Sequence, residues 1–536
     1  MAAPAQSIFS GPSAVTTGIF ASGTNFNTGL NFNQSNEEGL RRLREEFLHE
    51  VRRDQRDVLL KRQQPAQSLK TESQVESKES EDIPEDPQIL ELVKTTEQMD
   101  LSLISLETIC KGITSSNVAE NIQGLVILRE KILKEFVSLQ EVVDANLVQH
   151  LIIHLENQTC PRIALEACWC IANICTGDME HITSLVNKGL FQILPKILNH
   201  PRKDIFEQGA WAVGNIAADQ GGYRYKLQTH ATIKPLIDRL FTTKSPKEIE
   251  YITWVLCNLV KNPEGQKSFQ LEERKLALPA LFYLFRIIEN SETLDEVVST
   301  IVNVVDDGVL GELRKNQAVE RAIHVLRNNK PSIALIGSIL QMFNLISSGT
   351  DEDTSYLIEQ GVPEVLFNLL LSPEITNPWA QRECLWILSN IVAGTAEQRA
   401  VIISREAWVD IFFQYTTHQN ALIVREALWI LCNSTKRCSL EHAVKLARKG
   451  FLVLLRNAIV AKPPAEFLET CLEALNQILR IGVPTEPRKP NQFQLALEES
   501  GMLDTLEELQ FHPNQMVYER TANLIELYFQ VHDPVV

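Results

Sequence analysis

A tryptophan followed four residues later by an asparagine recurs five times along this chain, and this repeat restricts the possible folds more than any other feature. The copies read EACWCIANICTG, EQGAWAVGNIAAD, EYITWVLCNLVKN, ECLWILSNIVAG and EALWILCNSTKR. Their tryptophans, at 169, 211, 254, 386 and 429, are separated by 42, 43, 132 and 43 residues, and 132 is three steps of 44. Such regular spacing indicates one structural unit used many times in succession.

A period of this length is typical of armadillo and HEAT helical repeats. Weaker copies around Asn303 and Asn344 fill the long gap; they keep the asparagine and lack the tryptophan. With further copies before Trp169 and after Trp429, the chain holds about ten repeats. Beyond Ile89 the apolar residues recur with a helical period and no strand pattern is long enough for a sheet. We therefore predict an all-α, right-handed superhelical solenoid of about ten armadillo repeats behind a disordered and helical amino-terminal segment.

Several repeats carry a glycine directly before an apolar helix, as in KGLFQILPKIL and QGVPEVLFNLL. Glycine reaches the left-handed backbone region without steric cost, so it suits a tight turn between two helices. We expect such turns at Gly189, Gly361, Gly450 and Gly501.

The composition changes along the chain and predicts five regions. Residues 1–36 are rich in Ser, Gly, Asn, Thr and Ala without periodicity, as in a disordered tail. Residues 37–64 form a charged helix with a thin apolar seam, Leu43, Phe47 and Val51. Residues 65–88 are an acidic flexible linker, 89–530 the solenoid and 531–536 a tail.

The helix at 37–64 is basic although the chain as a whole is acidic. The chain has 51 Lys and Arg against 68 Asp and Glu, a formal net charge of −17. Between residues 41 and 62 the sign inverts, with eight bases and five acids. An acidic surface repels nucleic acid and anionic membranes and attracts basic partners. The eight bases are Arg41, Arg42, Arg44, Arg52, Arg53, Arg56, Lys61 and Arg62.

Other functional classes lack their signatures in this sequence. No stretch reaches the roughly 18 to 20 apolar residues of a membrane span, and the first residues do not form a secretion signal, so we expect no membrane insertion and a place in the cytosol or nucleus. The 10 cysteines lie singly within apolar segments, and their spacing fits no zinc motif, so reduced thiols and no metal are expected. Nucleotide-binding, hydrolase and metalloprotease motifs are missing, which predicts no enzyme and no cofactor.

The repeated Trp and Asn occupy one face of a helix, so stacked repeats align them into two parallel rows. A core position would tolerate leucine and would not bring a polar asparagine to the same face. Such rows suit an extended peptide. Asparagine amides can hydrogen-bond its backbone N–H and C=O groups, and indoles can contact the alkyl chains and cations of its Lys and Arg side chains. Acids three residues before a tryptophan, Glu166, Glu383 and Glu426, are candidates to complete the slots between adjacent indoles.

From about residue 39 to residue 529 the sequence resembles the importin-α family. Residues 41–64 look like the family's importin-β-binding segment and the Trp/Asn rows like its signal-binding groove. The stretch GMLDTLEELQFHPNQMVYERTANLIELYF is similar to its last repeat, which a recycling exportin grips together with Ran-GTP. The resemblance implies a nuclear import adaptor that binds basic nuclear localisation signals of cargo proteins, links them to importin-β and shuttles between cytoplasm and nucleus. Direct nucleic-acid binding is not implied.

The resemblance also implies two peptide sites. In the major site Asp219 would take the ammonium group of the key lysine, and the Gly177 carbonyl would assist; the family's nearby threonine is matched by Ile182, or by Thr183 after a shift. The major site comprises Glu166, Trp169, Asn173, Gly177, Gln208, Trp211, Asn215, Asp219, Trp254 and Asn258. The minor site comprises Asp351, Thr354, Glu383, Trp386, Asn390, Glu426, Trp429 and Asn433.

Two departures from the family pattern carry consequences. The fifth repeat has Ser299 and Asn303, or Thr300 and Val304 in the other register, so no aromatic side chain remains there. The family's auto-inhibitory Lys-Arg-Arg is matched only by KRQ at 61–63, which weakens the internal mimic of a signal. The alternative function is an armadillo scaffold that binds extended peptides of signalling or cytoskeletal partners without transport. Such a scaffold has no need of a tethered basic helix.

Overall fold

A computed structural model describes residues 86–157, 160–218, 222–229, 232–260, 274–305, 310–328, 330–373, 375–483 and 491–529. The predictions for the tail at 1–36, the basic helix at 37–64, most of the linker and the tail at 531–536 lie outside these residues. The described chain divides into two compact units, and the boundary falls within the helix that ends at Ser347. We call residues up to 338 the amino-terminal unit and those from 339 onward the carboxy-terminal unit; the short stretch 326–328 groups with the latter.

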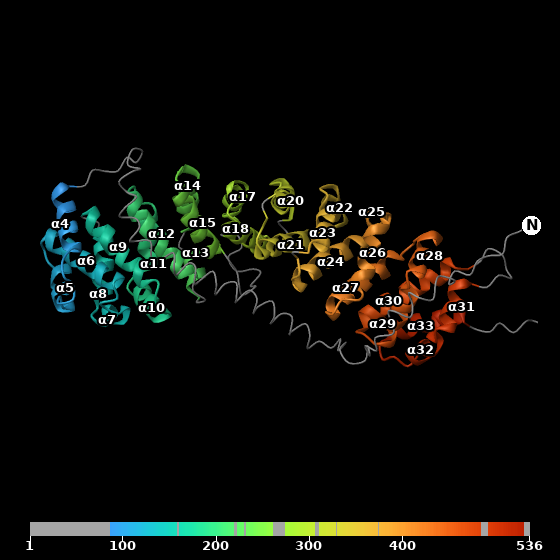
Figure 1. Ribbon diagram of the computed structural model, residues 1–536. Helices are drawn as coiled ribbons and strands as arrows, with labels where there is room; N and C mark the ends of the chain where they lie inside the picture. Colours follow the sequence, from blue (N-terminus) through green and yellow to red (C-terminus); the bar gives the residue numbers. More distant parts are fainter. Residues whose placement is uncertain are drawn as a thin grey trace, which may run out of the picture. The chain divides into compact units, whose positions relative to one another are not determined.

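In both units the described residues form α-helices and no β-strand, which confirms the predicted all-α fold (Figure 1). The helices follow one another in triplets, in which two shorter helices precede a longer one. The amino-terminal unit holds α4 (Pro87–Glu97), α5 (Leu106–Ile113), α6 (Val118–Leu133), α7 (Leu139–Asp144), α8 (Leu147–Asn157), α9 (Pro161–Ile174), α10 (Met179–Asn187), α11 (Leu190–Leu198), α12 (Lys203–Ala218), α13 (Tyr223–Thr229), α14 (Ile233–Thr242), α15 (Pro246–Val260), α17 (Leu278–Ile287), α18 (Ser291–Val304), α19 (Leu310–Lys315) and α20 (Ala318–Asn328).

The unit boundary lies in α21 (Ile333–Ser347). The carboxy-terminal unit continues with α22 (Asp351–Glu359), α23 (Val362–Leu371), α24 (Pro378–Ala393), α25 (Ala396–Ile403), α26 (Glu406–Tyr415), α27 (Ala421–Ser434), α28 (Leu440–Arg448), α29 (Phe451–Val460), α30 (Ala465–Ile481), α31 (Gln492–Glu499), α32 (Met502–Leu509) and α33 (Gln515–Tyr528).

Local sequence signals set the ends of these helices. The side chain of Asn420 accepts a hydrogen bond from a backbone N–H in the first turn of α27, and that of Asn377 does the same for α24, which satisfies donors that a helix leaves free. At the junctions between first and second helices the backbone turns through the left-handed region, as predicted. The φ angles are 100° at Gly189, 82° at Gly361, 91° at Gly450 and 74° at Gly501.

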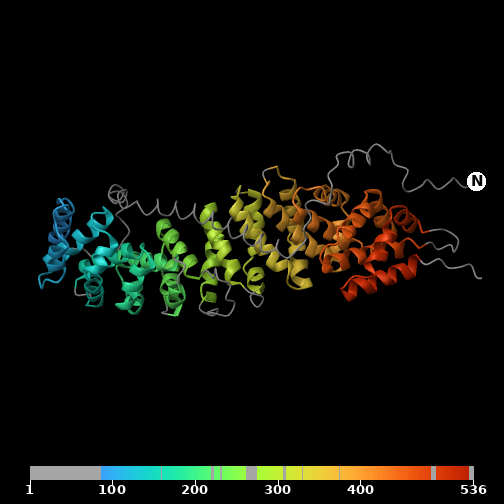
Figure 2. The ribbon, with the colours of Figure 1, turned by 90° about the horizontal axis from the view of Figure 1, so that it is seen from below.

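The third helices of successive triplets pack against one another within each unit. In the amino-terminal unit α6, α9, α12, α15 and α18 are consecutive neighbours, and in the carboxy-terminal unit α24, α27, α30 and α33 are. Figure 2 shows that the helices within each unit are arranged in the order of the chain. Packing on several sides buries nearly all of α9 from Ile163 to Ile174, whereas Trp169 and Asn173 keep partial exposure. In α9 the fold therefore leaves the Trp/Asn face as the accessible side of the helix.

The described residues also bear on the expectations for disulfides, metal sites and membrane spans. All ten cysteines are free, and burial raises the pKa of the thiols of Cys168, Cys170 and Cys175. Within the described ranges no cluster of His, Cys, Asp or Glu is arranged to hold a metal ion. In the same ranges, no helix combines the length and apolar character needed to span a bilayer.

Candidate functional site

In the amino-terminal unit, α9, α12 and α15 each present one tryptophan and one asparagine of the repeat. Trp169, Trp211 and Trp254 are all partly exposed, although neighbouring residues on their helices are buried. Because the three helices are consecutive neighbours, the predicted major-site aromatics come from adjacent repeats.

Trp211 and Trp254 are in ring contact, which differs from the expected slot between every pair of adjacent indoles. Their ring centroids lie 5.1 Å apart with an interplanar angle of 43°. An alkyl chain between two rings needs a van der Waals contact on each side, about 7 Å in total, so no chain fits between these two. Gly214 makes the contact possible, since a Cβ there would lie 2.1 Å from Cζ3 of Trp254. Between Trp169 and Trp211 the described residues show no ring contact.

The other end of this row is capped by a residue that the repeat pattern did not single out. The guanidinium of Arg129, on α6, lies 4.4 Å from the ring centre of Trp169. Arg129 also pairs with Glu97 at 2.8 Å, Glu130 at 2.7 Å and Glu166 at 2.7 Å. These contacts hold one face of the Trp169 indole against the first repeat.

Glu166, predicted as a slot acid, is enclosed by this cluster. Its side chain is 0% exposed, and besides Arg129 it accepts a hydrogen bond from Nη2 of Arg162 at 2.5 Å. A carboxylate held by two arginines without solvent access has no room for a ligand cation in this conformation. Glu166 therefore holds Arg129 in place over the Trp169 ring, and it is badly placed to contact a peptide directly.

The asparagines of the three helices differ in what their amides bind. Nδ2 of Asn215 donates to the carbonyl of Ala172 on the neighbouring helix at 3.1 Å. Nδ2 of Asn173 and Nδ2 of Asn258 are buried and have no hydrogen-bond partner in the described structure. A buried donor without a partner costs roughly 1–3 kcal/mol, so these two amides are places where an added acceptor would be stabilising.

The other residues predicted for the major site lie around this row of tryptophans or outside the described residues. Gln208 is partly exposed on α12, one turn before Trp211. Gly177 approaches His181 closely, since a Cβ there would lie 2.7 Å from its Nδ1. Of the two candidates for the family's threonine, Ile182 is buried in the core, and the Thr183 hydroxyl lies 2.9 Å from the Tyr223 hydroxyl. Asp219 lies outside the described residues.

In the carboxy-terminal unit, α24 and α27 present Trp386 and Trp429 with Asn390 and Asn433. Trp386 and Trp429 show no ring contact with each other in the described structure, and each is covered on another side. Trp429 stacks on Phe467 of α30, with centroids 5.1 Å apart and an interplanar angle of 25°. The guanidinium of Arg382 lies 5.0 Å from the ring centre of Trp386.

Polar groups of the carboxy-terminal unit link adjacent repeats. Nδ2 of Asn344 donates to Oε2 of Glu383 at 2.9 Å, and Nδ2 of Asn390 donates to the hydroxyl of Ser347 at 3.0 Å. Glu426 is 5% exposed and has only long contacts, 3.5 Å to Arg425 and 3.9 Å to Arg382. Burial raises the pKa of the Glu426 carboxyl, and the two arginines oppose this only in part.

The other predicted minor-site residues lie at different depths. Asp351 is exposed in the first turn of α22 and Thr354 is buried one turn later. Asn433 is buried at the end of α27. The fifth repeat lacks an aromatic side chain on α18, as the sequence indicates, and the amide of Asn303 donates to Ser299 of its own helix at 2.8 Å.

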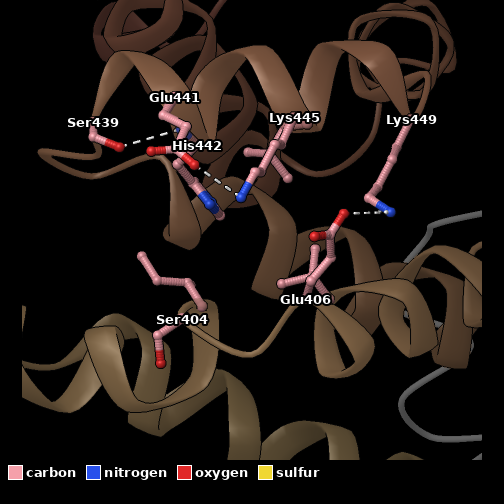
Figure 3. A pocket seen from close by; sticks show the side chains of 10 residues that line it. Ser404, Glu406, Ser439, Glu441, His442, Lys445 and Lys449 are labelled. Atoms are coloured by element: carbon pink, nitrogen blue, oxygen red, sulfur yellow. Dashed lines mark hydrogen bonds and ion pairs between the residues drawn. The ribbon is translucent and has the colours of Figure 1, made fainter.

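Figure 3 shows a pocket in the carboxy-terminal unit whose lining includes no tryptophan or asparagine of the repeat. It is formed by α25, α26 and α28, and none of its lining residues belongs to the predicted sites. Its charged groups face each other: Lys445 pairs with Glu441 at 3.0 Å and Lys449 with Glu406 at 3.5 Å. Within these pairs the positive and negative charges neutralise each other where two repeats meet.

The residues that sequence reasoning missed are those that cover the rings, namely Arg129, Gly214, Arg382 and Phe467. Arg382 was detectable, because a residue four positions before Trp386 lies on the same helical face. Arg129 and Phe467 come from neighbouring repeats, and only the packing of one helix on the next brings them to a tryptophan. The basic residues at 41–62 that were predicted to bind importin-β lie outside the described residues.

Two family models match parts of the chain. Residues 138–176, which end just after Trp169 and Asn173, match the armadillo/β-catenin-like repeat, and residues 491–534 match an atypical armadillo repeat. Among solved structures, an engineered protein aligns with 80% of this chain and 98% of its own at a TM-score of 0.61 and 20% identity. A structure from work on the cadherin and β-catenin interaction aligns with 82% of this chain and 90% of its own, with a TM-score of 0.64 and 14% identity.

Curated relatives match along most of the chain. Importin subunit alpha-1b of Oryza sativa subsp. japonica is 24% identical over 449 residues, which cover 82% of this chain and 81% of the relative. Importin subunit alpha-4 of Arabidopsis thaliana is 26% identical over 503 residues, which cover 91% and 88%. The chain thus contains armadillo repeats, folds as an armadillo-type helical solenoid, and is similar over most of its length to plant importin-α proteins.

Proposed function

We propose that this chain is a non-enzymatic adaptor that binds basic nuclear localisation signals of cargo proteins along its Trp/Asn helices and links them to importin-β. The observation that carries the proposal is the pair of buried, unpartnered amide donors of Asn173 and Asn258, each one turn from a partly exposed tryptophan. The similarity to plant importin-α proteins supports the same function.

The chemistry of the two groups defines the ligand. An extended peptide leaves its backbone C=O groups free, and each asparagine Nδ2 that receives one removes an unsatisfied donor from the protein. The indoles attract the cations of lysine and arginine by about 0.5–2 kcal/mol each. The formal net charge of −17 raises the local concentration of a basic ligand further.

The proposal includes two further partners and a location. The basic helix at 41–62 is the segment for importin-β, since its charge opposes that of the rest of the chain. The last triplet would contact the recycling exportin with Ran-GTP. Its exposed apolar side chains favour a protein contact: Phe511 is 89% exposed and Leu527 68%. Such a protein shuttles between cytoplasm and nucleus.

Asparagine substitutions test the peptide site. The probe is a fluorescent peptide with one cluster of lysines and arginines, titrated against the full chain. Asn173→Ala combined with Asn258→Ala should weaken binding by about five- to a hundredfold, because two hydrogen bonds of about 0.5–1.5 kcal/mol each are lost. Asn303→Ala is the matched control, because its amide is bound within its own helix. Equal affinity of the double variant and the control would refute the proposed site.

Importin-β binding separates the adaptor from a scaffold without transport. Replacement of Arg52, Arg53 and Arg56 by Glu reverses the charge of the basic helix without touching the described repeats. An adaptor should bind importin-β in a pull-down and lose it in this variant, while the affinity for a basic peptide does not fall. If the unaltered full chain binds basic peptides but not importin-β, the scaffold function holds instead.

A further inference from the structure

Arg382 and Glu426 meet beside the Trp386 indole in the carboxy-terminal unit. Arg382 is on α24, one turn before Trp386, and its guanidinium carbon is 5.0 Å from the ring centre. Its Nε lies 3.9 Å from Oε1 of Glu426, on the neighbouring helix α27. This Nε is buried and has no hydrogen-bond partner in the described part of the chain. The arginine thus reaches from the indole of one repeat toward the carboxylate of the next, without a good hydrogen bond at either.

A bound basic peptide would use the same two groups. A ligand cation at this position would lie over the indole and pair with Glu426, which is otherwise buried with only long contacts. We propose that Arg382 occupies the cation position over Trp386 in the unbound protein, so that a basic peptide must displace it and binds the minor site more weakly. This inference rests on the proposed function, because it concerns the preference between the two peptide sites.

Two of the three major-site tryptophans have the opposite charge at the equivalent position; the third, Trp169, has Leu165 there and lies under Arg129 of α6. Four residues before Trp211 stands Glu207, and four residues before Trp254 stands Glu250. A carboxylate one turn from the indole attracts an incoming cation, whereas a guanidinium there competes with it. At this position Trp211 and Trp254 of the major site follow a glutamate, whereas Trp386 of the minor site follows an arginine.

Arg425 separates the effect of ring coverage from that of charge alone. It stands four residues before Trp429, and its Nη2 is 3.5 Å from Oε1 of Glu426. The Trp429 ring stacks on Phe467, and within the described residues no guanidinium lies over it. Arg425 thus carries the same charge near the same carboxylate without covering an indole.

The experiment measures minor-site affinity in the full chain, with Trp211→Ala and Trp254→Ala as the background. The probe is the fluorescent peptide with one basic cluster. If a further substitution, Trp386→Ala, removes the residual binding in this background, that binding occurs at the minor site. In this background Arg382→Ala should tighten binding by about two- to thirtyfold, the range of one cation–π contact. Arg425→Ala should tighten it by less. Arg382→Gln, which keeps most of the side-chain length, should act like Arg382→Ala and retain the wild-type helical signal and melting temperature.

The reverse exchange tests the same position in the other unit. Glu207→Arg in the unaltered chain should weaken single-cluster peptides by a factor similar to that gained with Arg382→Ala. The inference is overturned if Arg382→Ala and Arg382→Gln leave minor-site affinity unchanged or lower, or if Arg425→Ala tightens it equally. Absence of peptide binding in the wild-type chain overturns the proposed function itself, whereas binding at both sites without tightening overturns only the role of Arg382.

Discussion

Replacement of Gly214 by alanine should damage the major peptide site without destabilising the fold. The alanine Cβ would lie 2.1 Å from Cζ3, 2.7 Å from Cη2 and 2.8 Å from Cε3 of the Trp254 ring. Carbon atoms in contact need about 3.5 Å, so the ring has to move by about 1.4 Å. The atoms that would clash are the outer part of an indole that is partly exposed, so the side chain can yield where backbone could not.

The energy terms nearly cancel for stability, whereas for binding they do not. Alanine in a helix interior is favoured over glycine by about 0.5–1 kcal/mol, which offsets the loss of the Trp211–Trp254 contact, worth about 0.5–1.5 kcal/mol. If the proposed peptide site is right, the displaced ring also loses its contact with the peptide cation, worth about 0.5–2 kcal/mol. The melting temperature should therefore change by no more than a few degrees, while affinity for a single-cluster basic peptide falls about three- to thirtyfold.

Titration calorimetry of the full chain with that peptide measures the effect, and Gly311→Ala is the matched control. No atom lies within 4 Å of a Cβ built at Gly311, in the first turn of α19, so this exchange adds a methyl group to a helix without meeting a neighbour. The double variant Gly214→Ala with Trp254→Ala should bind as Trp254→Ala does, because the glycine acts through the ring. Undiminished affinity of Gly214→Ala, or an equal loss in the Trp254→Ala background, would refute the reasoning.

Three further predictions concern the other parts of the chain. Trp386→Ala combined with Trp429→Ala should weaken a peptide with two basic clusters at least about fivefold and spare one with a single cluster; equal losses in calorimetry would contradict two separate sites. Burial raises the pKa of Glu426, so the folded state binds its proton more tightly than the unfolded state and loses stability as the pH rises through the raised pKa. Glu426→Gln should therefore melt at or above the wild-type temperature near about pH 7, and this advantage should shrink on acidification to about pH 5; a lower melting temperature at neutral pH would be inconsistent with that sign. Deletion of residues 1–62 should raise affinity for a basic peptide only about two- to tenfold, because KRQ at 61–63 offers few cations to compete, and a gain of hundreds would show strong self-inhibition instead.

Much of the architecture could be predicted because its causes are local or periodic. The succession of helical repeats follows from a hydrophobic period of 3.6 within a repeat of 42 to 44 residues. The turns at Gly189 and Gly361 follow from the backbone freedom of glycine. The Trp-to-Asn spacing placed both side chains on one helical face, and the structure leaves that face as the accessible side of buried helices such as α9.

The surroundings of each side chain on the Trp/Asn face depended on contacts with neighbouring repeats, which the sequence pattern did not reveal. Glu166 shares its offset from tryptophan with Glu383 and Glu426, and the sequence treats the three alike. In the structure Glu166 is enclosed by Arg129 and Arg162, Glu383 accepts from Asn344, and Glu426 has only long contacts. Equal spacing therefore did not imply equal surroundings, because each carboxylate meets a different neighbour.

The sequence by itself determined that tryptophans and asparagines recur on one face of stacked helices, because that depends only on periodicity. Only the tertiary structure decided which ring faces are open. Trp254 rests on Trp211, Trp429 on Phe467, Trp169 under Arg129 and Trp386 under Arg382. Most of these partners lie some 40 residues apart, and their meeting depends on side-chain conformers and on the register between helices. A repeat period specifies which residues face the same way, but it does not specify how far each side chain reaches across to the next repeat.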